Sequence, residues 1–496
     1  MHGPIDEGAQ PGSEGGVRAQ MEDHALTAVP DDERRSGWGL MTNTAGIAST
    51  LVQLAIGGGV TLIAGVGYGI LAGVLVAVFG GILGWLVGHV AYRSGTSSTV
   101  TARFYGLGLR GSAIASLIFA FMILGFLALE NALLYYGTLF MFGWSPTTAN
   151  AIVIYGVLTL AWIALTAFGL KVVQGTSMVL LVAFVVLTVV MAGLALAKSD
   201  TSLSQLMSAG PVVPGYGGQG ERFTAVLSIL AGSAGALALV DADFARYAKS
   251  GRDVGILAVG GAIMIDVLVV VLGTIIIHAG SSVVGDYLTA HPATAATQQG
   301  TGIADKVAWM VNNNSGAYFV VLAGFIGFLL MYVAQAKAQV LNTYSGSLAL
   351  SNLFNSLTGR TVGRVVMVVV GNVIGLVMVA GDILGLINSY LGILGVTTMA
   401  LAGVIVADFF IVRRGHKAEA DQLEAVNWAG VISVLAAAGT GGALQETDVT
   451  QLGFLISLAM VLVLYPLLRT SVLRPSTTVP AGPGHGRAPV GSAPGR

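Results

Sequence analysis

Apolar residues in this chain gather into long segments that are separated by short polar stretches. Each segment is close to the roughly 20 residues that an α-helix needs to cross the hydrocarbon core of a bilayer. The pattern therefore predicts an all-α integral membrane protein with twelve transmembrane helices, numbered here as spans 1 to 12 in chain order. Their expected ranges are 39–64, 67–91, 112–142, 148–169, 174–197, 222–245, 254–279, 317–346, 362–380, 384–411, 428–446 and 452–470.

Composition supports a membrane protein and removes several other classes. Apolar residues make up 55% of the chain and charged residues 9%, where a soluble domain has roughly a quarter charged residues. The absence of cysteine excludes disulfides and thiolate sites, and a net charge of −1 gives no reason to expect nucleic acid as a partner. The chain has no phosphate-binding glycine loop, metal-spaced His/Asp/Glu cluster or serine triad, so neither an enzyme nor a cofactor is expected.

The two ends of the chain and its basic residues predict an orientation. Residues 1–36 and 471–496 are polar and rich in Gly and Pro, which indicates disordered tails. If the N-terminus is cytoplasmic, 19 of the 23 Lys and Arg residues fall in cytoplasmic segments and three in external loops, with Lys337 inside a span. This asymmetry favours an even number of crossings and predicts a protein of the cytoplasmic membrane with both termini inside the cell.

Glycine is abundant, at 70 residues, and several of its clusters lie inside expected spans. Gly80, Gly84 and Gly88 recur at four-residue spacing in span 2, a pattern typical of close helix packing. Residues 57–59 in span 1 and 232–235 in span 6 are instead expected to unwind their helices and free backbone groups. Paired broken helices at corresponding positions of two inverted five-helix halves mark a transporter's binding site. The alternative is glycine packing alone.

Two ionisable residues lie within otherwise apolar spans, Glu130 in span 3 and Lys337 in span 8. A charged side chain inside a bilayer is costly, so it indicates a functional site by default. The structural alternatives are a Glu130 carboxylate that only holds helices together through hydroxyls, and a Lys337 side chain that extends to the cytoplasmic interface. Asp266, in span 7, is consistent with either a proton path or a structural carboxylate.

Four short motifs give the chain a family resemblance. They are 98–104 with Gly106 and Gly108 after span 2, 243–247 at the end of span 6, 407–410 with Arg413 and Arg414 at the end of span 10, and 426–428 at the start of span 11. With these motifs in this order and spacing from Trp38 to Leu468, the chain resembles the nucleobase–cation symporters, the cytosine, purine, allantoin and hydantoin permeases.

The resemblance implies a LeuT-like fold of two inverted five-helix repeats, here residues 37–205 and 206–415, with two peripheral helices in 416–470. It also implies that a small heterocycle binds between spans 1, 3, 6 and 8, and a coupling cation between spans 1 and 8. The substrate positions carried over from the family are Phe126, Glu130, Ala234, Gln339 and Asn342. The cation positions carried over are Gly46, Thr50 and Lys337.

Three of these positions depart from the family pattern. Glu130 places a carboxylate where members commonly have an amide, which suits adjacent N–H donors or a cationic ligand, and it can also carry a proton. Lys337 supplies a fixed positive charge that repels sodium, so sodium-independent transport is expected. Ala234 replaces an aromatic residue, so the ligand is stacked on one side only. Either the pocket is larger than usual or the ligand is not a flat base, and the identity of the substrate stays open.

The expected function is a secondary active symporter that imports a small nitrogen heterocycle, a nucleobase such as cytosine or a purine or a hydantoin- or allantoin-type compound, by alternating access. Protons or the substrate gradient are expected to drive it. Ser233 and Gln53 complete the expected substrate contacts, Glu130 joins the cation-coupling group, and Asp243 with Arg246 forms a cytoplasmic gate. Expected partners are the substrate, a proton and the lipid bilayer, with no obligate protein partner. An amine or amino-acid transporter on the same fold is the alternative, and a channel or receptor is a more remote one.

Overall fold

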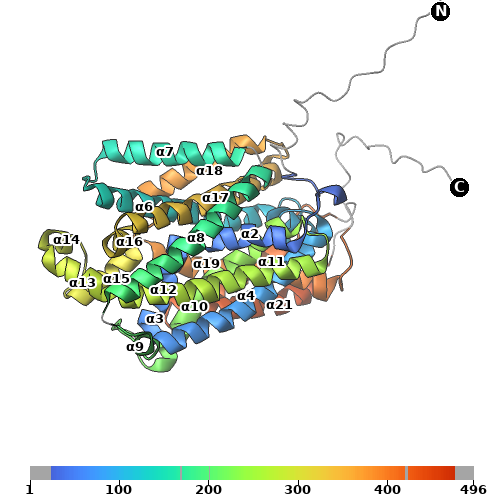
Figure 1. The fold of residues 1–496 in the computed structure, drawn as a ribbon. Coiled ribbons are helices and arrows are strands. Elements are labelled where there is room, and N and C mark those ends of the chain that lie inside the picture. Colours follow the sequence, from blue (N-terminus) through green and yellow to red (C-terminus); the bar gives the residue numbers. More distant parts are fainter. Residues whose placement is uncertain (1–23, 168–169, 200, 419–422, 475–496) are drawn as a thin grey trace, which may run out of the picture.

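The computed structural model describes residues 24–167, 170–199, 201–418 and 423–474, whose regular elements are helices. Most of the long helices run along one common direction (Figure 1). The α-helices are α2 (Gly37–Ala48), α3 (Leu51–Ala64), α4 (Val66–Ser94), α5 (Ser98–Ala102), α6 (Ser112–Phe142), α7 (Thr148–Ala167), α8 (Leu170–Lys198), α9 (Leu203–Met207), α10 (Gln219–Ala245), α11 (Gly251–Ile263), α12 (Val269–Thr274), α13 (Gly280–Ala290), α14 (Pro292–Ala296), α15 (Ile303–Asn313), α16 (Ser315–Ala323), α17 (Phe325–Thr358), α18 (Arg364–Ala380), α19 (Ile387–Val406), α20 (Trp428–Glu446) and α21 (Gly453–Leu467). Short 3-10 or π-helical segments are η1 (Asp31–Glu33), η2 (Arg103–Leu107), η3 (Met264–Leu268), η4 (Ile275–Ala279), η5 (Ala407–Val412) and η7 (Leu468–Val472).

Nine helices of the described residues are long and apolar enough to cross a membrane, and the bent pair α2–α3 makes a tenth. These ten correspond to all the expected spans except spans 8 and 9. Span 8 falls on α16 and α17, and span 9 falls on α18, which has only 17 residues. The 34-residue α17 lies in the interior and faces other helices, so it can carry polar side chains. These polar side chains lower the mean hydropathy of the helix. Ile152, Leu160 and Val179 on α7 and α8 are at least 68% exposed, as expected of side chains that face lipid.

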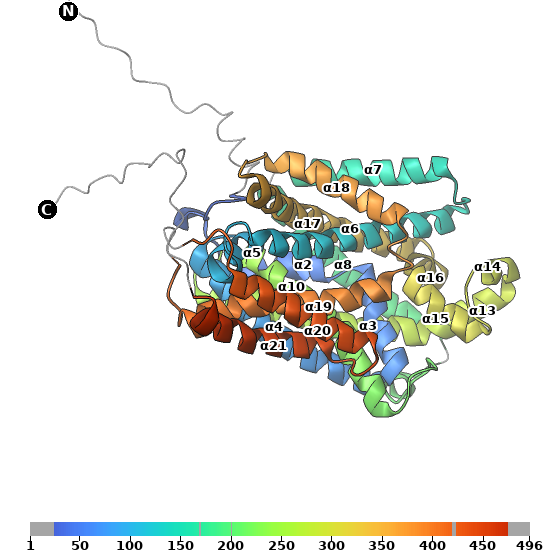
Figure 2. The same cartoon turned by 180° about the vertical axis from the view of Figure 1, so that it is seen from behind.

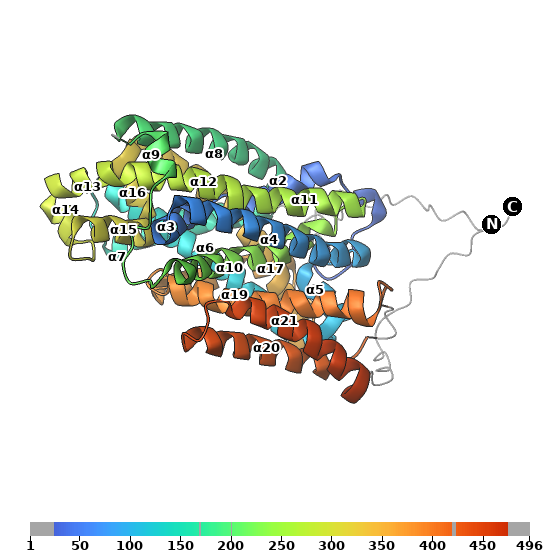
Figure 3. The same cartoon turned by 90° about the horizontal axis from the view of Figure 1, so that it is seen from below.

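The helices form one bundle whose two ends can be told apart. Both ends of the described chain lie at the same end of the bundle, called here the terminal end (Figure 1). The short helices α9 and α13 to α16 lie at the opposite, far end. Helices α7 and α18 pack together on one side of the bundle, and α20 and α21 pack together on another side (Figures 2 and 3).

Span 1 breaks at Ser49 and Thr50, where α2 and α3 meet at an angle of 70°. The Thr50 hydroxyl caps α3 by accepting a hydrogen bond from the backbone N–H of Gln53 at 3.1 Å. The expected break at residues 57–59 is wrong, because these glycines lie within α3. A Cβ atom on Gly57 would come within 2.7 Å of the Cα atom of Val270, so the glycines let α3 pack closely on α12.

Span 6 is not broken, since α10 is helical without interruption through residues 232–235. The expected unwinding there is wrong, and close packing explains these glycines too. A Cβ atom on Gly232 would lie 3.2 Å from the carbonyl oxygen of Leu391, and one on Gly235 would lie 2.5 Å from the Thr398 hydroxyl. Both neighbours belong to α19, so the small residues of span 6 bring these two helices together.

The predicted packing role of the span 2 glycines is confirmed. A Cβ atom on Gly80 would lie 3.0 Å from the Cβ atom of Ala234, and one on Gly84 would lie 2.4 Å from a carboxyl oxygen of Asp241. One turn further along α4, Gly88 faces α10 and α11 at similarly short distances. The glycine stripe therefore allows α4 to lie against α10 along most of its length.

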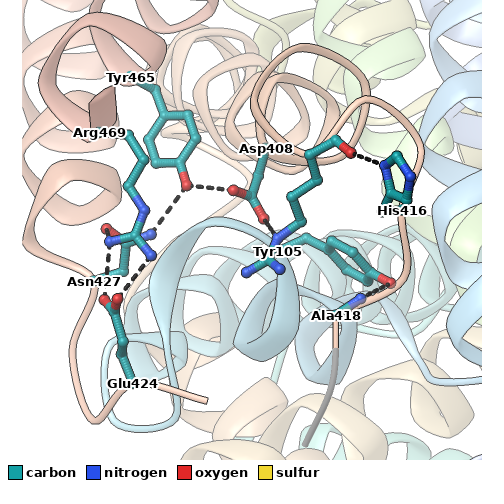
Figure 4. A network of polar contacts seen from close by, with 9 residues as sticks. Tyr105, Asp408, His416, Ala418, Glu424, Asn427, Tyr465 and Arg469 are labelled. Atoms are coloured by element: carbon teal, nitrogen blue, oxygen red, sulfur yellow. Dashed lines mark hydrogen bonds and ion pairs between the residues drawn. The ribbon is translucent and has the colours of Figure 1, made fainter. Parts of the chain in front are cut away.

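A polar network holds the terminal end of α19 to that of α21 (Figure 4). Asp408 accepts hydrogen bonds from the Tyr465 hydroxyl at 2.6 Å and from Arg413 Nε at 2.8 Å. Arg469 of η7 pairs with Glu424, with 2.7 Å between Nη2 and Oε1. Several of the residues that carry the family resemblance thus have a structural role, because they tie the last three spans together.

The described part of the N-terminal segment packs against the terminal end. Residues 24–36 were expected in a disordered tail, but Val29 is buried and the backbone N–H of Arg35 donates to the carbonyl of Tyr247 at 2.6 Å. Residues 471–474 continue from η7. The remaining residues of both expected tails lie outside the described residues.

Candidate functional site

A small cavity lies in the middle of the bundle beside the break of span 1. Its volume is about 30 Å³, which holds about two water molecules. A ligand of the size of a heterocycle therefore requires the helices around the cavity to move apart. The residues that line it are Ile47, Thr50, Gln53, Ile123, Phe126, Glu130, Ser233, Ala236, Leu237, Val240, Ile265 and Asn342.

The cavity brings together predicted residues from spans 1, 3, 6 and 8. These are Thr50, Gln53, Phe126, Glu130, Ser233 and Asn342. Asn342 Nδ2 donates to Glu130 Oε2 at 3.2 Å, and the Thr50 hydroxyl faces the same carboxyl. The Ser233 hydroxyl donates to Gln53 Oε1 at 3.3 Å. The cavity wall thus offers one acidic group, two amides and two hydroxyls, a set that can recognise several donors and acceptors on one small molecule.

Phe126 is supported by an aromatic residue that the sequence interpretation did not identify. The ring of Tyr390 in α19 meets it edge to face, with 5.6 Å between the ring centroids. The Tyr390 hydroxyl donates to the backbone carbonyl of Met122, which fixes its orientation. Tyr390 comes soon after the start of α19, and only the packing of that helix on α6 places the ring beside the cavity.

Two predicted substrate positions lie outside the cavity wall. Ala234 faces Gly80 on α4 and is not part of the cavity wall, whereas Ala236 and Leu237 of the same helix are. Gln339 faces α6, where its Nε2 donates to Asn131 Oδ1 at 2.8 Å. On α10 the cavity face is formed by Ser233, Ala236, Leu237 and Val240, and Ala234 points away from it because neighbouring helix positions are turned by about 100°. Gln339 still accepts a hydrogen bond from Asn342 at 3.3 Å and so orients it.

Lys337 is fully buried and binds the backbone at the break of span 1. Its Nζ donates to the carbonyl of Gly46 at 2.8 Å, to the carbonyl of Ser49, and to the carbonyl of Ala334 at 3.3 Å. The ammonium also lies 4.5 Å from the ring centroid of Phe184 in α8, a cation–π distance. The alternative in which Lys337 reaches the membrane interface is therefore wrong, because the side chain is held in the interior.

The break itself accounts for this position of Lys337. Where α2 ends, carbonyls that would have bonded within a continuous helix need other donors. Lys337 of span 8 supplies these donors. Gln335 of the same span is instead an acceptor, and its side chain receives a hydrogen bond from the backbone N–H of Leu51 at 3.4 Å. Glu130 lies near enough for its charge to interact with that of Lys337, but the two side chains form no ion pair within 4.0 Å.

The two predicted gate residues lie at the terminal end of α10 and connect it to several segments. Asp243 accepts hydrogen bonds from the backbone N–H and the hydroxyl of Ser98, at 2.9 and 2.8 Å. Arg246 donates to the carbonyl of His24 at 2.8 Å and to the Tyr344 hydroxyl at 3.0 Å. These contacts close the bundle between α5, α10, α17 and the N-terminal segment.

A larger cavity lies on the other side of the site, toward the far end. Its volume is about 330 Å³, and α3, α10 and α19 form much of its wall. Polar side chains also line it, namely Ser228 of α10, Asn312 and Gln445 near the ends of α15 and α20, and Gln451 of the loop before α21. The bundle is thus hollow toward the far end and closed by polar contacts at the terminal end.

Comparison with solved structures shows the fold. Mhp1, a nucleobase-cation-symport-1 family transporter, is similar in its closed conformation with bromovinylhydantoin bound, with a TM-score of 0.66 and 20% identity over 90% of this chain and 94% of that chain. The inward-facing conformation of Mhp1 gives a TM-score of 0.62 and 19% identity over 88% and 91% of the two chains. A Na⁺-coupled sialic acid symporter in a substrate-bound outward-open state gives 0.60 and 13% over 94% and 98%. These likenesses show an all-helical membrane protein with a LeuT-like fold.

The sequence itself places the chain in a family. No curated protein matches it. The family profile described as "permease for cytosine/purines, uracil, thiamine, allantoin" matches residues 28–462, which is most of the chain and includes every residue of the central cavity. The protein therefore belongs to this family of membrane permeases, and it is a transporter and not an enzyme.

Proposed function

We propose that this chain imports a small nitrogen heterocycle, such as a nucleobase or a hydantoin- or allantoin-type compound, without sodium and with protons as the driving ion. It does so by alternating access in the cytoplasmic membrane, with both termini inside the cell. The proposed architecture has twelve spans, in which α16–α17 and α18 are spans 8 and 9, arranged as two inverted five-helix repeats and two peripheral helices.

The observation that carries the proposal is the position of Lys337. Hard cations such as sodium are bound by oxygen ligands, including backbone carbonyls. Here the carbonyls of Gly46 and Ser49 at the break of span 1 are already bound by an ammonium group. A second positive charge at this place would meet strong repulsion in a medium of low dielectric constant. Lys337 thus supplies permanently the charge that a coupling sodium ion would bring.

The cavity residues have complementary roles in ligand binding. Phe126 stacks on the flat face of the heterocycle, and Glu130 accepts hydrogen bonds from its N–H groups. Asn342 and Gln53 contact its polar edge, and Ser233 contributes its hydroxyl rather than an unwound backbone. Because Glu130 also lies beside Lys337, its charge can change during the cycle and link ligand binding to proton movement.

The gate completes the proposed cycle. The contacts of Asp243 and Arg246 keep the terminal end closed while the far-end cavity admits the ligand. Opening toward the cytoplasm requires these contacts to separate, since they join α10 to α5, α17 and the N-terminal segment. The closed terminal end thus corresponds to a state that precedes release of the ligand.

Uptake into proteoliposomes tests the proposal. Radiolabelled cytosine, uracil, a purine, allantoin and hydantoin would be offered to the full-length protein in sodium buffer and in potassium buffer. We expect at least one of them to be taken up equally well in both buffers, and Lys337→Thr to make uptake depend on sodium. Lys198→Thr, which changes an exposed lysine at the end of α8, is the matched control. Uptake that needs sodium in the unmodified protein would eliminate the proposal.

A second candidate, an amine or amino-acid transporter, is favoured by one observation. Glu130 is an acidic group in the cavity wall, and a carboxylate can pair with a ligand's ammonium group. Glu130→Gln separates the two candidates, because an amide still accepts hydrogen bonds from a neutral heterocycle but no longer neutralises a cation. Competition of unlabelled amines against labelled cytosine or allantoin gives an independent comparison. The channel alternative loses support, because span 1 is broken and the family consists of permeases.

A further inference from the structure

Two buried aspartates outside the ligand cavity have no polar partner in the part of the chain that the structure describes. Asp241 of α10 and Asp266 of η3 are each 1% exposed. Neither oxygen of either carboxyl group takes part in a hydrogen bond. The hydroxyl of Thr44 in α2 faces Asp241 but closes no hydrogen bond with it. Such groups are rare inside proteins, because a buried polar atom without a partner is costly.

Both carboxyl groups lie against the same helix, at neighbouring turns. A Cβ atom on Gly84 of α4 would lie 2.4 Å from Asp241 Oδ2, and one on Gly80 would lie 3.7 Å from Asp266 Oδ2. Residues four apart on a helix have Cβ atoms only about 5–6 Å from each other. The two aspartates thus come from spans 6 and 7 and meet the same glycine stripe of span 2.

Their charge state follows from these surroundings. An isolated ionised carboxylate in a dry interior costs several kcal/mol, whereas the protonated acid is neutral. No cation compensates either group among the described residues. Other titratable side chains on the surrounding helices contact different residues. His89 of α4 lies against Phe409, and Asp243 of α10 binds Ser98. Asp266 also lies in a π-helical segment, a feature that often marks functional positions.

The proton is the ligand that fits this pair of groups. A sodium ion needs several oxygen ligands around it, but the carboxyl oxygens of Asp241 and Asp266 form no hydrogen bond with any described group and lie against glycines of α4. A proton needs only one carboxylate oxygen, which becomes a hydroxyl with no other reactant. Water supplies the proton on one side of the membrane and takes it up on the other.

Both aspartates lie beside the wall of the ligand cavity. Val240 and Ile265, their neighbours in the chain, line that cavity. The cavity holds about two water molecules, so ligand entry must displace these walls. Displacement of α10 and η3 relative to α4 would separate the carboxyl groups from the glycine stripe and let water reach them.

We propose that Asp241 and Asp266 bind the protons that drive uptake, at a site between spans 2, 6 and 7 that is separate from the ligand cavity. This proposal rests on the proposed proton-coupled function and assigns its driving ion to these two groups. Each aspartate is protonated in the closed arrangement and releases its proton when the helices move. Glu130 then binds the ligand in the cavity, and a change in its charge links ligand binding to the protonation of the two aspartates.

Infrared spectroscopy tests the site without a transported ligand. The full-length protein in liposomes would be titrated upward from pH about 6, where exposed carboxyl groups are already ionised, while the carbonyl band of the carboxyl groups that remain protonated is followed. We expect Asp241→Asn and Asp266→Asn each to remove part of the band that disappears on titration. Asp448→Asn, at an exposed position, is the matched control and should leave it unchanged. The proposal is overturned if both buried variants titrate like the unmodified protein, or if sodium at constant pH removes the same band.

Transport provides the second test. In proteoliposomes with a pH gradient, both buried variants should lose accumulation of labelled cytosine or allantoin but retain exchange of labelled for unlabelled compound. Retained exchange shows that the variants are folded and still bind the ligand. Accumulation that survives in both variants overturns the proposal. If the unmodified protein takes up neither compound, the proposed function fails for these ligands, while the infrared titration still decides whether the two aspartates bind protons.

Discussion

Replacing Lys337 by methionine removes the ammonium group but keeps a side chain of similar length. The carbonyls of Gly46 and Ser49, which this group binds at the break of span 1, then lose a donor in a place that water does not reach. A buried acceptor without a partner costs about 1–3 kcal/mol, so two of them cost about 2–6 kcal/mol. Removing a buried charge relieves part of that cost, since its desolvation is itself unfavourable. We expect a net destabilisation in the lower half of this range.

Thermal unfolding of the purified protein, followed by the fluorescence of its six tryptophans, measures this loss. Lys198→Met is the matched control, because Lys198 donates a single hydrogen bond, to the carbonyl of Leu322 at 2.8 Å, from an exposed position. Its substitution should change stability by no more than about 0.5 kcal/mol. Lys337→Thr adds a second comparison, because this variant is expected to bind sodium in place of the ammonium group. Sodium at 100 times its dissociation constant would then raise the free energy of unfolding of the variant by about 2.7 kcal/mol.

Two results would refute the reasoning about Lys337. One is an unfolding temperature of Lys337→Met that equals that of Lys198→Met, which would mean that the carbonyls at the break do not need the ammonium group. The other is a result in which sodium stabilises the unmodified protein as strongly as it stabilises Lys337→Thr. Either result would show that the lysine does not occupy the place of a coupling cation.

Three further substitutions test other parts of the structure. Gly84→Ala should destabilise the protein by about 1–3 kcal/mol in thermal unfolding, because its Cβ atom would overlap α10, while Gly439→Ala, with no atom within 4 Å, should be neutral or stabilising. Arg469→Gln should cost about 3–5 kcal/mol by leaving the buried Glu424 without its cation, and a double variant that also neutralises Glu424 should recover most of it. Phe126→Ala should weaken binding of a flat heterocycle by about ten- to a hundredfold in a binding assay. It should also lower the free energy of unfolding by about 3–5 kcal/mol, because it truncates a buried ring. Equal affinity would exclude stacking on this ring.

The helical architecture could be predicted from the sequence to a large extent, whereas local breaks could not. The length of an apolar segment is a local property, so the expected ranges fall on helices throughout the described residues. Glycine content did not locate the break of span 1. Residues 57–59 are needed for packing on α12, while the break at Ser49 and Thr50 depends on Lys337 and Gln335, which are almost 300 positions away in the chain.

The candidate site was predicted in part. Phe126, Glu130 and Asn342, which the family resemblance indicated, line one cavity together with Gln53. Phe126 and Glu130 are four positions apart in α6 and therefore share a helix face. Ala234 lies outside the cavity wall, because the face of α10 that meets the cavity is set by how its small residues pack on α4 and α19. Tyr390 and the apolar members of the cavity wall carry no sequence signal that distinguishes them from other buried side chains.

The sequence by itself determined that this protein is a multi-spanning membrane transporter with an acidic and a basic residue in its interior, because hydropathy and charge act along the chain. The tertiary structure alone decided what those residues touch. The binding of Lys337 to the carbonyls of span 1, and the burial of Asp241 and Asp266 against the glycines of span 2, come from contacts between distant segments. Such contacts depend on the packing of whole helices against one another, which no local pattern specifies.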